Sequence, residues 1–257
     1  MTKPLPIAAI KEKLVHSEEL TAEFITSLRV DNRQGVQKLL QQYDKRQAKV
    51  VALQQKYQEM SQFEKQARLK GAQVICGIDE VGRGPLAGPV VAAAVVLPTD
   101  CVLLGLNDSK QLSEKQRDTL FLAIQEQALA IGIGSIAPEI IDEVNIYEAS
   151  KLAMIQAVEN LALTPDYLLI DAMVLDMPIT QEKLIKGDAR SISIAAASIV
   201  AKVTRDRWMQ EYDQIYPGYD FAHNAGYGTA KHLAGLAELG ITPIHRHSFA
   251  PVKKYLR

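Results

Sequence analysis

The stretch "VICGIDEVGRGPLAGPVVAAAVVL", from Val74 to Leu97, decides the fold. It holds two short apolar runs rich in β-branched residues, separated by glycines and prolines, which predicts two buried β-strands joined by a turn. The first run ends on two adjacent acids, Asp79 and Glu80, and the motif "GRG" at Gly82–Gly84 follows almost at once. Two carboxylates at the end of a buried strand stay ionised only if a positive charge compensates them. The same stretch is therefore a candidate for a functional site.

Working outward, the sequence after Leu97 alternates apolar runs with amphipathic segments. Three further strands are expected at "IGIGSIA", "DYLLID" and "EKLIKGD", and the last two end on Asp171 and Asp188. Helical patterns cover residues 114–130, 138–163, 190–216 and 228–240. This order predicts an α/β domain with a mixed central sheet flanked by helices.

Residues 1–70 show a helical pattern, with apolar residues at helical spacing and no strand pattern. Gly71 marks the change. We therefore expect a helical N-terminal extension over 1–70 and a second domain with added C-terminal helices over 71–257. The extension is basic, so it either grips duplex nucleic acid through salt-dependent phosphate contacts or braces the second domain.

The composition is that of an ordinary globular protein, with 47% hydrophobic and 23% charged residues. The net charge of -1 hides an acidic middle segment, residues 71–185, between basic flanks. This pattern suits an enzyme whose acidic site holds cations while its flanks hold a polyanion, and it also fits a solvated surface with a chance imbalance. No apolar stretch predicts a membrane span and no secretory signal is recognised. Cys76 and Cys101 lack C-x-x-C partners, so reduced cysteines and a cytoplasmic location are expected.

Acids follow three of the expected strands at the point where each strand ends: Asp79 with Glu80, Asp171, and Asp188. In an open α/β sheet, sites form outside the carboxyl ends of the strands, so these acids can meet. Several carboxylates stay ionised together only if cations compensate them. Oxygen ligands suit Mg²⁺ or Mn²⁺, and two such ions catalyse in-line phosphoryl displacement.

Each feature also has a simpler explanation. A single Asp after a strand is most often a helix cap or a turn residue, which holds for Asp171 and for Asp188. The "GRG" motif permits close approach of backbone amides to a ligand, and equally a tight turn with Arg83 in solvent. The histidines of "HRHSF", His245 and His247, have no third soft ligand nearby in the sequence. We therefore expect a packed, hydrogen-bonded segment there rather than a metal site.

A more specific signal comes from motifs that occur in a fixed order. They are "GIDEVGRGPLAGPVVAAAVVL", "NDSKQLSEKQR", "LLIDA", "KGDARSISIAAASIVAKVTRDRWM", "HNAGYGTAKH" and "GITPIHRHSF". Together they resemble ribonuclease HII, the type 2 ribonuclease H family, over roughly Gly71 to the C-terminus. The resemblance implies a ribonuclease H-like fold and a metal-dependent endonuclease. Its substrates would be RNA/DNA hybrids and duplex DNA with single embedded ribonucleotides, cut 5′ of the ribonucleotide to leave 3′-hydroxyl and 5′-phosphate ends.

The resemblance also assigns roles by matching position. It implies four catalytic carboxylates that bind two Mn²⁺ or Mg²⁺ ions: Asp79, Glu80, Asp171 and Asp188. A backbone reader of the 2′-hydroxyl is implied at Gly82, Arg83 and Gly84. Tyr227 resembles the tyrosine that stacks on the deoxyribose after the ribonucleotide. Residues of the "NDSK" motif resemble those that line the substrate groove and bind phosphate: Asn107, Ser109 and Lys110.

Two alternatives stay open at this point. Ribonuclease HIII, a sister enzyme that favours longer RNA stretches, typically has Glu in the fourth acidic role and a β-rich N-terminal domain. Asp188 and the helical pattern of residues 1–70 both argue against it. A non-catalytic hybrid-binding module would not need four acids, and a metal titration with a one-ribonucleotide duplex separates it from an enzyme.

Overall fold

The structure is a computed structural model that describes residues 5–15 and 20–256. The chain forms two compact units, residues 1–56 and residues 57–257. Within the described ranges, no helix is both long enough and apolar enough to cross a membrane.

The N-terminal unit is built from helices, as the sequence predicts. It contains α1 (Ile7–Val15), α2 (Ala22–Arg29) and most of α3 (Gln34–Met60). The Thr21 side chain accepts a hydrogen bond from the Phe24 amide and so caps the start of α2. Apolar side chains at helical spacing form a small core of the unit's own: Ile10, Leu14, Leu28, Val36 and Leu40.

The second unit is organised around a five-stranded sheet with the order β3-β2-β1-β4-β5. Its strands are β1 (Ile75–Val81), β2 (Val90–Val96), β3 (Ala130–Ile136), β4 (Tyr167–Asp171) and β5 (Thr180–Leu184). The pairs β1–β2 and β2–β3 are antiparallel, whereas β1–β4 and β4–β5 are parallel. The mixed sheet expected from the sequence is therefore confirmed.

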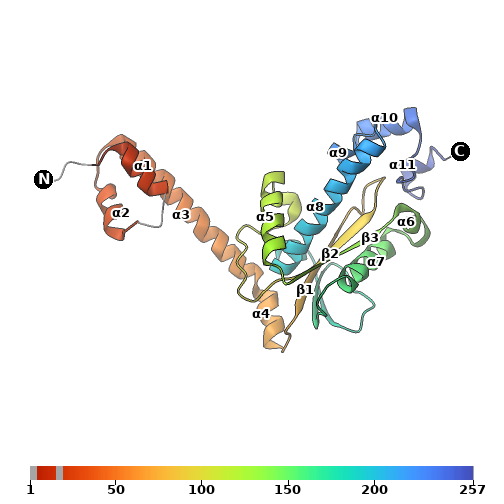
Figure 1. The fold of residues 1–257 in the computed structure, drawn as a ribbon, viewed down its shortest axis with the longest axis horizontal. Coiled ribbons are helices and arrows are strands. Elements are labelled where there is room, and N and C mark those ends of the chain that lie inside the picture. Colours follow the sequence, from red (N-terminus) through yellow and green to blue (C-terminus); the bar gives the residue numbers. More distant parts are fainter. Residues whose placement is uncertain (1–4, 16–19, 257) are drawn as a thin grey trace. The chain divides into compact units, whose positions relative to one another are not determined.

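Helices cover both faces of this sheet (Figure 1). Along β2, Ala93 and Val95 pack into a core with α5 and α8, while Ala92 and Ala94 pack into a second core with α7. The strand is buried on both faces, which explains its continuous apolar sequence. The helical elements of this unit after α3 are α4 (Gln62–Leu69), η2 (Ser109–Gln111), α5 (Glu114–Gln127), α6 (Pro138–Val144), α7 (Ile146–Glu159), η3 (Gly187–Ala189), α8 (Ile192–Ile215), α9 (Phe221–Asn224), α10 (Ala230–Leu239) and α11 (Ala250–Lys253).

The start of α8 lies directly against β1. A Cβ atom on Gly77 would lie only 2.1 Å from the backbone carbon of Ser193, so a glycine is needed in the strand at this point. Because α8 is rich in alanine near its start, its backbone can approach the sheet closely. This contact fixes the helix beside the acids of β1.

The C-terminal helices α9, α10 and α11 form a third cluster over the loop between β1 and β2. Leu86 and Ala87 of that loop pack with Phe221, Leu236 and Val252 of these helices. The packing brings the segment around Tyr227, between α9 and α10, next to the "GRG" motif.

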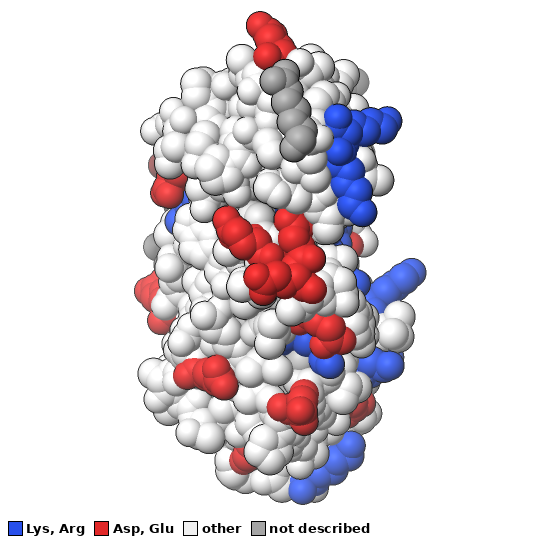
Figure 2. All heavy atoms as spheres, turned by 90° about the vertical axis from the view of Figure 1, so that its right-hand side faces the viewer, with Lys and Arg blue, Asp and Glu red and all other residues white. Residues whose placement is uncertain are grey.

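Acidic side chains gather near the middle of the face that lies to the right in Figure 1, and lysines and arginines lie at its margin (Figure 2). The helix α6 is on this side and carries Glu139, Asp142 and Glu143.

Two strand ends differ from the sequence-based expectation. The strand expected to end on Asp188 instead ends at Leu184, and Asp188 lies in the short helix η3. The reason is that Lys186 adopts a left-handed conformation, with φ 55°, and turns the chain so that the Gly187 amide can bond to Asp171. The strand β1 continues past the two acids to Val81, rather than ending at Glu80.

Candidate active site

Three carboxylates come together at the carboxyl ends of β1 and β4. These strands are parallel neighbours, and Ile78 pairs with Ile170, so the residues that follow, Asp79 and Asp171, lie side by side. One oxygen from each of Asp79, Glu80 and Asp171 lies within 4.8 Å of the others. Since adjacent strand residues ordinarily face opposite ways, the convergence of Asp79 and Glu80 is a feature of this strand end.

Backbone amides hold two of these carboxylates. The Glu80 amide donates to Asp79 Oδ1 at 2.8 Å, and the Gly187 amide donates to Asp171 Oδ1 at 2.6 Å. Ala172, directly after Asp171, has φ 51°, a conformation that is unfavourable for a residue with a Cβ atom. Such strained residues are typical of functional sites, where the surrounding structure imposes them.

Asp188 lies next to this group without belonging to the 4.8 Å set. The pKa of Asp188 is raised to about 6, first by burial and then by the charges of Asp108 and Asp171. Behind Asp188, the Glu64 carboxylate of α4 accepts hydrogen bonds from Ser191 Oγ at 2.6 Å and the Ser193 amide at 3.0 Å. The first turn of α8, and with it the segment that carries Asp188, is therefore tied to α4.

All four acids, which we call the acid cluster, have raised pKa values. For Asp79, which is only 5% exposed, burial is the largest cause, followed by the charges of Glu80 and Asp171. Burial raises the pKa of Glu80 to about 7 although Arg83 opposes the shift, and burial also raises the pKa of Asp171. The cluster thus repels itself when ionised. An all-oxygen, partly buried donor set of this kind fits a hard divalent cation.

The "GRG" motif lies at the rim of the cluster. Arg83 Nη1 is 3.6 Å from Glu80 Oε1, and its side chain is partly in solvent. Gly82 has φ 93°, which strongly favours glycine. A Cβ atom on Gly84 would lie 3.3 Å from Cε1 of Tyr227, so the structure brings the tyrosine ring against the motif. The Tyr227 side chain is large, apolar and 47% exposed.

The "NDSK" residues lie in and before η2, near the acids. Lys110 is exposed, and its charge lowers the pKa of Glu80, Asp171 and Asp188. Asn107 donates to Gln111 at the rim. Ser109 is buried, with its Oγ 2.9 Å from Ser198 Oγ of α8.

Two residues near the acids, Asp108 and Ser198, were not identified from the sequence. Asp108 raises the pKa of Asp171 and of Asp188 through its charge. Its position between Asn107 and Ser109 could have drawn notice, but an Asp before a short helix is ordinarily a cap, and Asp108 does accept from the Lys110 amide. Ser198 lowers the pKa of Asp79, and a serine in an alanine-rich helix gives no signal of such a role.

The histidine segment is hydrogen-bonded, as expected, but only His245 is packed, since His247 is exposed. His245 Nε2 lies 2.9 Å from His232 Nε2, and the Thr242 amide donates to His245 Nδ1. His232 Nδ1 lies 2.9 Å from the Tyr227 carbonyl. Since a carbonyl only accepts, His232 donates there and His245 donates to His232, with both rings neutral.

Comparison with known proteins identifies the family. The ribonuclease HII family model matches residues 76–252, and that of the ribonuclease HII N-terminal domain matches residues 6–68. Ribonuclease HII of Enterococcus faecalis is 62% identical over 247 residues, which cover 96% of this chain and 97% of the relative. Ribonuclease H2 from Pyrococcus horikoshii OT3 is similar in structure, with TM-score 0.64 and 28% identity over 71% of this chain and 97% of the other. Ribonuclease HII in a complex with PCNA from Archaeoglobus fulgidus has TM-score 0.58 and 26% identity, covering 68% and 94%. The chain belongs to the ribonuclease HII family.

Proposed function

We propose that this chain is a divalent-metal-dependent endonuclease that removes ribonucleotides from DNA. It cleaves the RNA strand of RNA/DNA hybrids and cuts 5′ of single ribonucleotides in duplex DNA, leaving 3′-hydroxyl and 5′-phosphate ends. Membership of the ribonuclease HII family over nearly the whole chain supports the reaction. The observation that carries the chemistry is the meeting of Asp79, Glu80 and Asp171 oxygens within 4.8 Å.

In this proposal the acid cluster holds two Mn²⁺ or Mg²⁺ ions. When bound, such ions activate water as a nucleophile and stabilise the departing oxygen. Asp79 lies between its neighbours and is the most buried of the four acids, which supports a role as the shared ligand. Asp188 completes the set from η3, where Glu64 and the start of α8 fix its segment.

Substrate recognition is proposed to lie at the rim. The backbone of Gly82, Arg83 and Gly84 would read the 2′-hydroxyl, the only group that distinguishes RNA from DNA at one nucleotide. The exposed ring of Tyr227 lies against Gly84. It would stack on the next deoxyribose, which fits poorly if a hydroxyl is present.

The "NDSK" residues are proposed to line the same groove. Lys110 is exposed and electrostatically coupled to the acids, so its ammonium is well placed to bind a phosphate beside them. Asn107 adds an amide at the rim. Ser109 is buried against Ser198, which supports a contribution through holding its neighbours in place.

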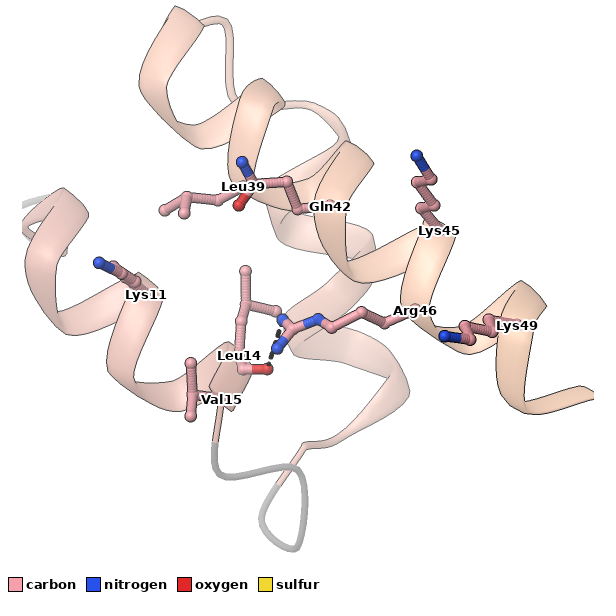
Figure 3. Close-up of a pocket in the computed structure, with 8 residues that line it drawn as sticks. All are labelled: Lys11, Leu14, Val15, Leu39, Gln42, Lys45, Arg46 and Lys49. Carbon is pink, nitrogen blue, oxygen red and sulfur yellow. Dashed lines mark hydrogen bonds between the residues drawn. The ribbon is translucent and has the colours of Figure 1, made fainter. Parts of the chain in front are cut away.

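For residues 1–70 we propose a contact with the duplex outside the reaction centre. A hollow between α1 and α3 is lined by Lys11, Leu14, Val15, Leu39, Gln42, Lys45, Arg46 and Lys49. Figure 3 shows the three lysine amines around it and the Arg46 guanidinium, which donates to the Leu14 carbonyl at 3.1 Å. Four cations on one small surface suit a sugar-phosphate backbone. A bracing role for this extension is the alternative.

The cysteines support a reducing, cytoplasmic location. Cys76 and Cys101 are both free and buried. Burial raises the pKa of the Cys76 thiol to about 12, so it is unreactive at neutral pH.

A cleavage assay on a duplex with one ribonucleotide tests the proposal. Cutting that depends on added Mg²⁺ or Mn²⁺ is expected, at the 5′ side of the ribonucleotide. Binding without cutting at any metal concentration would instead favour a hybrid-binding module. A strong preference for long RNA stretches over the single ribonucleotide would favour activity like that of ribonuclease HIII.

A further inference from the structure

Two arginines are fully buried in the second unit. Arg205 of α8 is 1% exposed, and Arg246, shortly before α11, is 0% exposed. Among the described residues, neither has a carboxylate within 4.0 Å. Burial lowers the pKa of Arg205 to about 10 and that of Arg246 to about 9, so both are charged at neutral pH. A buried charge without an ion pair is costly and needs a reason.

The partners of Arg246 are carbonyl oxygens of the loop that contains "GRG". Its Nε donates to Gly88 at 3.0 Å and its Nη1 donates to Arg83 at 3.0 Å. Its Nη2 donates to Gly82 and, at 2.8 Å, to Gly88. One guanidinium therefore fixes both ends of this loop.

Arg205 joins that loop to the segment before Tyr227. Its Nε donates to the Pro89 carbonyl at 2.9 Å and its Nη2 to the Ala87 carbonyl at 3.0 Å. Its Nη1 donates to the Ala225 carbonyl at 2.8 Å. We call residues 82–89 and 225–229 the reading loops. Arg205 sets their positions relative to each other.

These contacts determine where the amides of the motif point. A trans peptide places its N–H opposite its C=O. Because the Gly82 and Arg83 carbonyls point at Arg246, the amides of Arg83 and Gly84 point away from it. Donation from a cation to a carbonyl also polarises the peptide and strengthens its N–H as a donor.

The glycine at position 82 reflects the same arrangement. A Cβ atom there would lie 2.3 Å from Arg205 Nε and 2.8 Å from the Pro89 carbonyl oxygen. The space beside this residue is thus occupied by the arginine. A residue with a Cβ atom at position 82 would therefore displace the Arg205 side chain that holds the loop.

We propose that Arg205 and Arg246 are positioning residues for ribonucleotide recognition, which aim the amides of Arg83 and Gly84 at the 2′-hydroxyl. This inference rests on the proposed function. Lysine cannot replace either arginine, because a single ammonium cannot span several carbonyls as the planar guanidinium does. The chemistry at the acid cluster is not assigned to them.

The test uses the full chain and Arg246→Lys, with Arg207→Lys as the control. Arg207 lies two residues from Arg205 on α8 and stacks over Phe121, outside the reading loops. Cleavage of a labelled one-ribonucleotide duplex is measured with an unlabelled all-DNA duplex of the same sequence as competitor. The ratio of the competitor's inhibition constant to KM reports discrimination of the 2′-hydroxyl, and the Mn²⁺-induced rise in Tm reports the acid cluster.

For Arg246→Lys we expect kcat/KM to fall by about 100-fold and the discrimination ratio to move towards one, with the Mn²⁺-induced rise in Tm retained. Arg207→Lys should match the wild type. If Arg246→Lys folds and its discrimination ratio is unchanged, because both duplexes are weakened equally, the inference is overturned. If Arg246→Lys does not fold, Arg205→Lys is judged by the same criteria. Failure of the wild-type protein to cleave would refute the proposed function itself. That result is distinct from any difference between the wild type and the arginine variants.

Discussion

The acid cluster and the reading loops satisfy their charges in opposite ways. In the acid cluster, burial and the charges of neighbouring carboxylates raise the pKa of each acid, and an added cation would compensate the negative charge. In the reading loops, the buried cations Arg205 and Arg246 already donate to backbone carbonyls of the protein. In the proposed function, folding therefore completes the loops that recognise the substrate, whereas the catalytic acids would be completed only by metal binding.

The largest expected effect comes from breaking the acid cluster. Asp79→Asn should lower kcat by at least about 10³-fold, because metal assistance contributes several kcal/mol to transition-state stabilisation. Single-turnover cleavage measures the loss. The Tm of the metal-free variant should equal or exceed that of the wild type, since a buried charge is removed, while the Mn²⁺-induced rise in Tm should shrink. Turnover near that of the wild type would remove Asp79 from the proposed site.

A smaller effect is expected from the reading loops. Tyr227→Ala should reduce cleavage at a single embedded ribonucleotide by about tenfold or more, since stacking on an aromatic ring contributes roughly 1–3 kcal/mol. Tyr227→Phe is the matched control and should keep most activity, because the ring is proposed to act. Both variants are compared on a continuous RNA/DNA hybrid as well. Equal, small losses of the Ala variant on both substrates would make Tyr227 a loop-packing residue.

The sequence predicted the acids better than it predicted what supports the reading loops. Asp79 and Asp171 follow apolar strands, and parallel pairing of β1 with β4 brings such positions together in any sheet of this type. Arg205 stands in a charged part of a long helix, where an arginine ordinarily lies in solvent. Its burial arises only because α8 packs beneath the loop of Gly82 and Gly88.

The ends of the strands were also predicted less well from the sequence than the strands themselves. The apolar pattern placed the first four strands well but set the fifth at residues 182–188, whereas β5 spans Thr180–Leu184. Nothing local shows that the Gly187 amide bonds to Asp171 across sixteen residues. The left-handed turn at Lys186 likewise lacks the glycine that would signal it. Such details depend on tertiary contacts, which a single sequence does not display.

The charge of the acid cluster should also appear in the pH dependence of stability. The folded-state pKa of Glu80 is raised from 4.5 to about 7 and that of Asp188 from 3.8 to about 6. The raised pKa values mean that the folded state binds more protons at these two carboxylates, so their contribution to the unfolding free energy falls as pH rises from about 4 to 8. Burial lowers the pKa of His245 to about 4 and also lowers that of His232, so these histidines act in the opposite direction below about pH 6.5. For the metal-free protein, Glu80 alone should contribute on the order of 3 kcal/mol to the fall. Urea unfolding at several pH values measures it.

A cation should oppose that trend, because it binds the deprotonated carboxylates. With saturating Mn²⁺ the stabilisation should be larger at pH 8 than at pH 5. Glu80→Gln should flatten the curve of the metal-free protein. A difference in unfolding free energy between the wild type and Glu80→Gln that does not change with pH would show that Glu80 is compensated within the fold.

The smallest effects are expected from the N-terminal unit. Removing residues 1–56 should leave the sheet folded and raise Kd for duplex by roughly threefold to tenfold, with a shallower salt dependence. Full-length protein with Lys11, Lys45 and Lys49 changed to Glu should show the same change if the hollow binds phosphate. Salt dependence identical to that of the wild type in both would favour the bracing role.

Comparing two truncations of the chain locates the boundary between the units more finely. Removing residues 1–70 also deletes Met60, Glu64 and Ala67, which pack into the second unit, and Glu64 bonds to the start of α8. We expect this longer truncation to have a lower Tm than removal of residues 1–56. Equal Tm values would show that α4 adds little to the fold and would favour a domain boundary at Gly71.

The most direct measurement is product analysis on duplex DNA with one ribonucleotide, with and without Mn²⁺ or Mg²⁺. The proposal predicts one metal-dependent cut, 5′ of the ribonucleotide, with 3′-hydroxyl and 5′-phosphate ends, and no cut in the all-DNA control. Cleavage without a divalent metal, or at a position unrelated to the ribonucleotide, would contradict it.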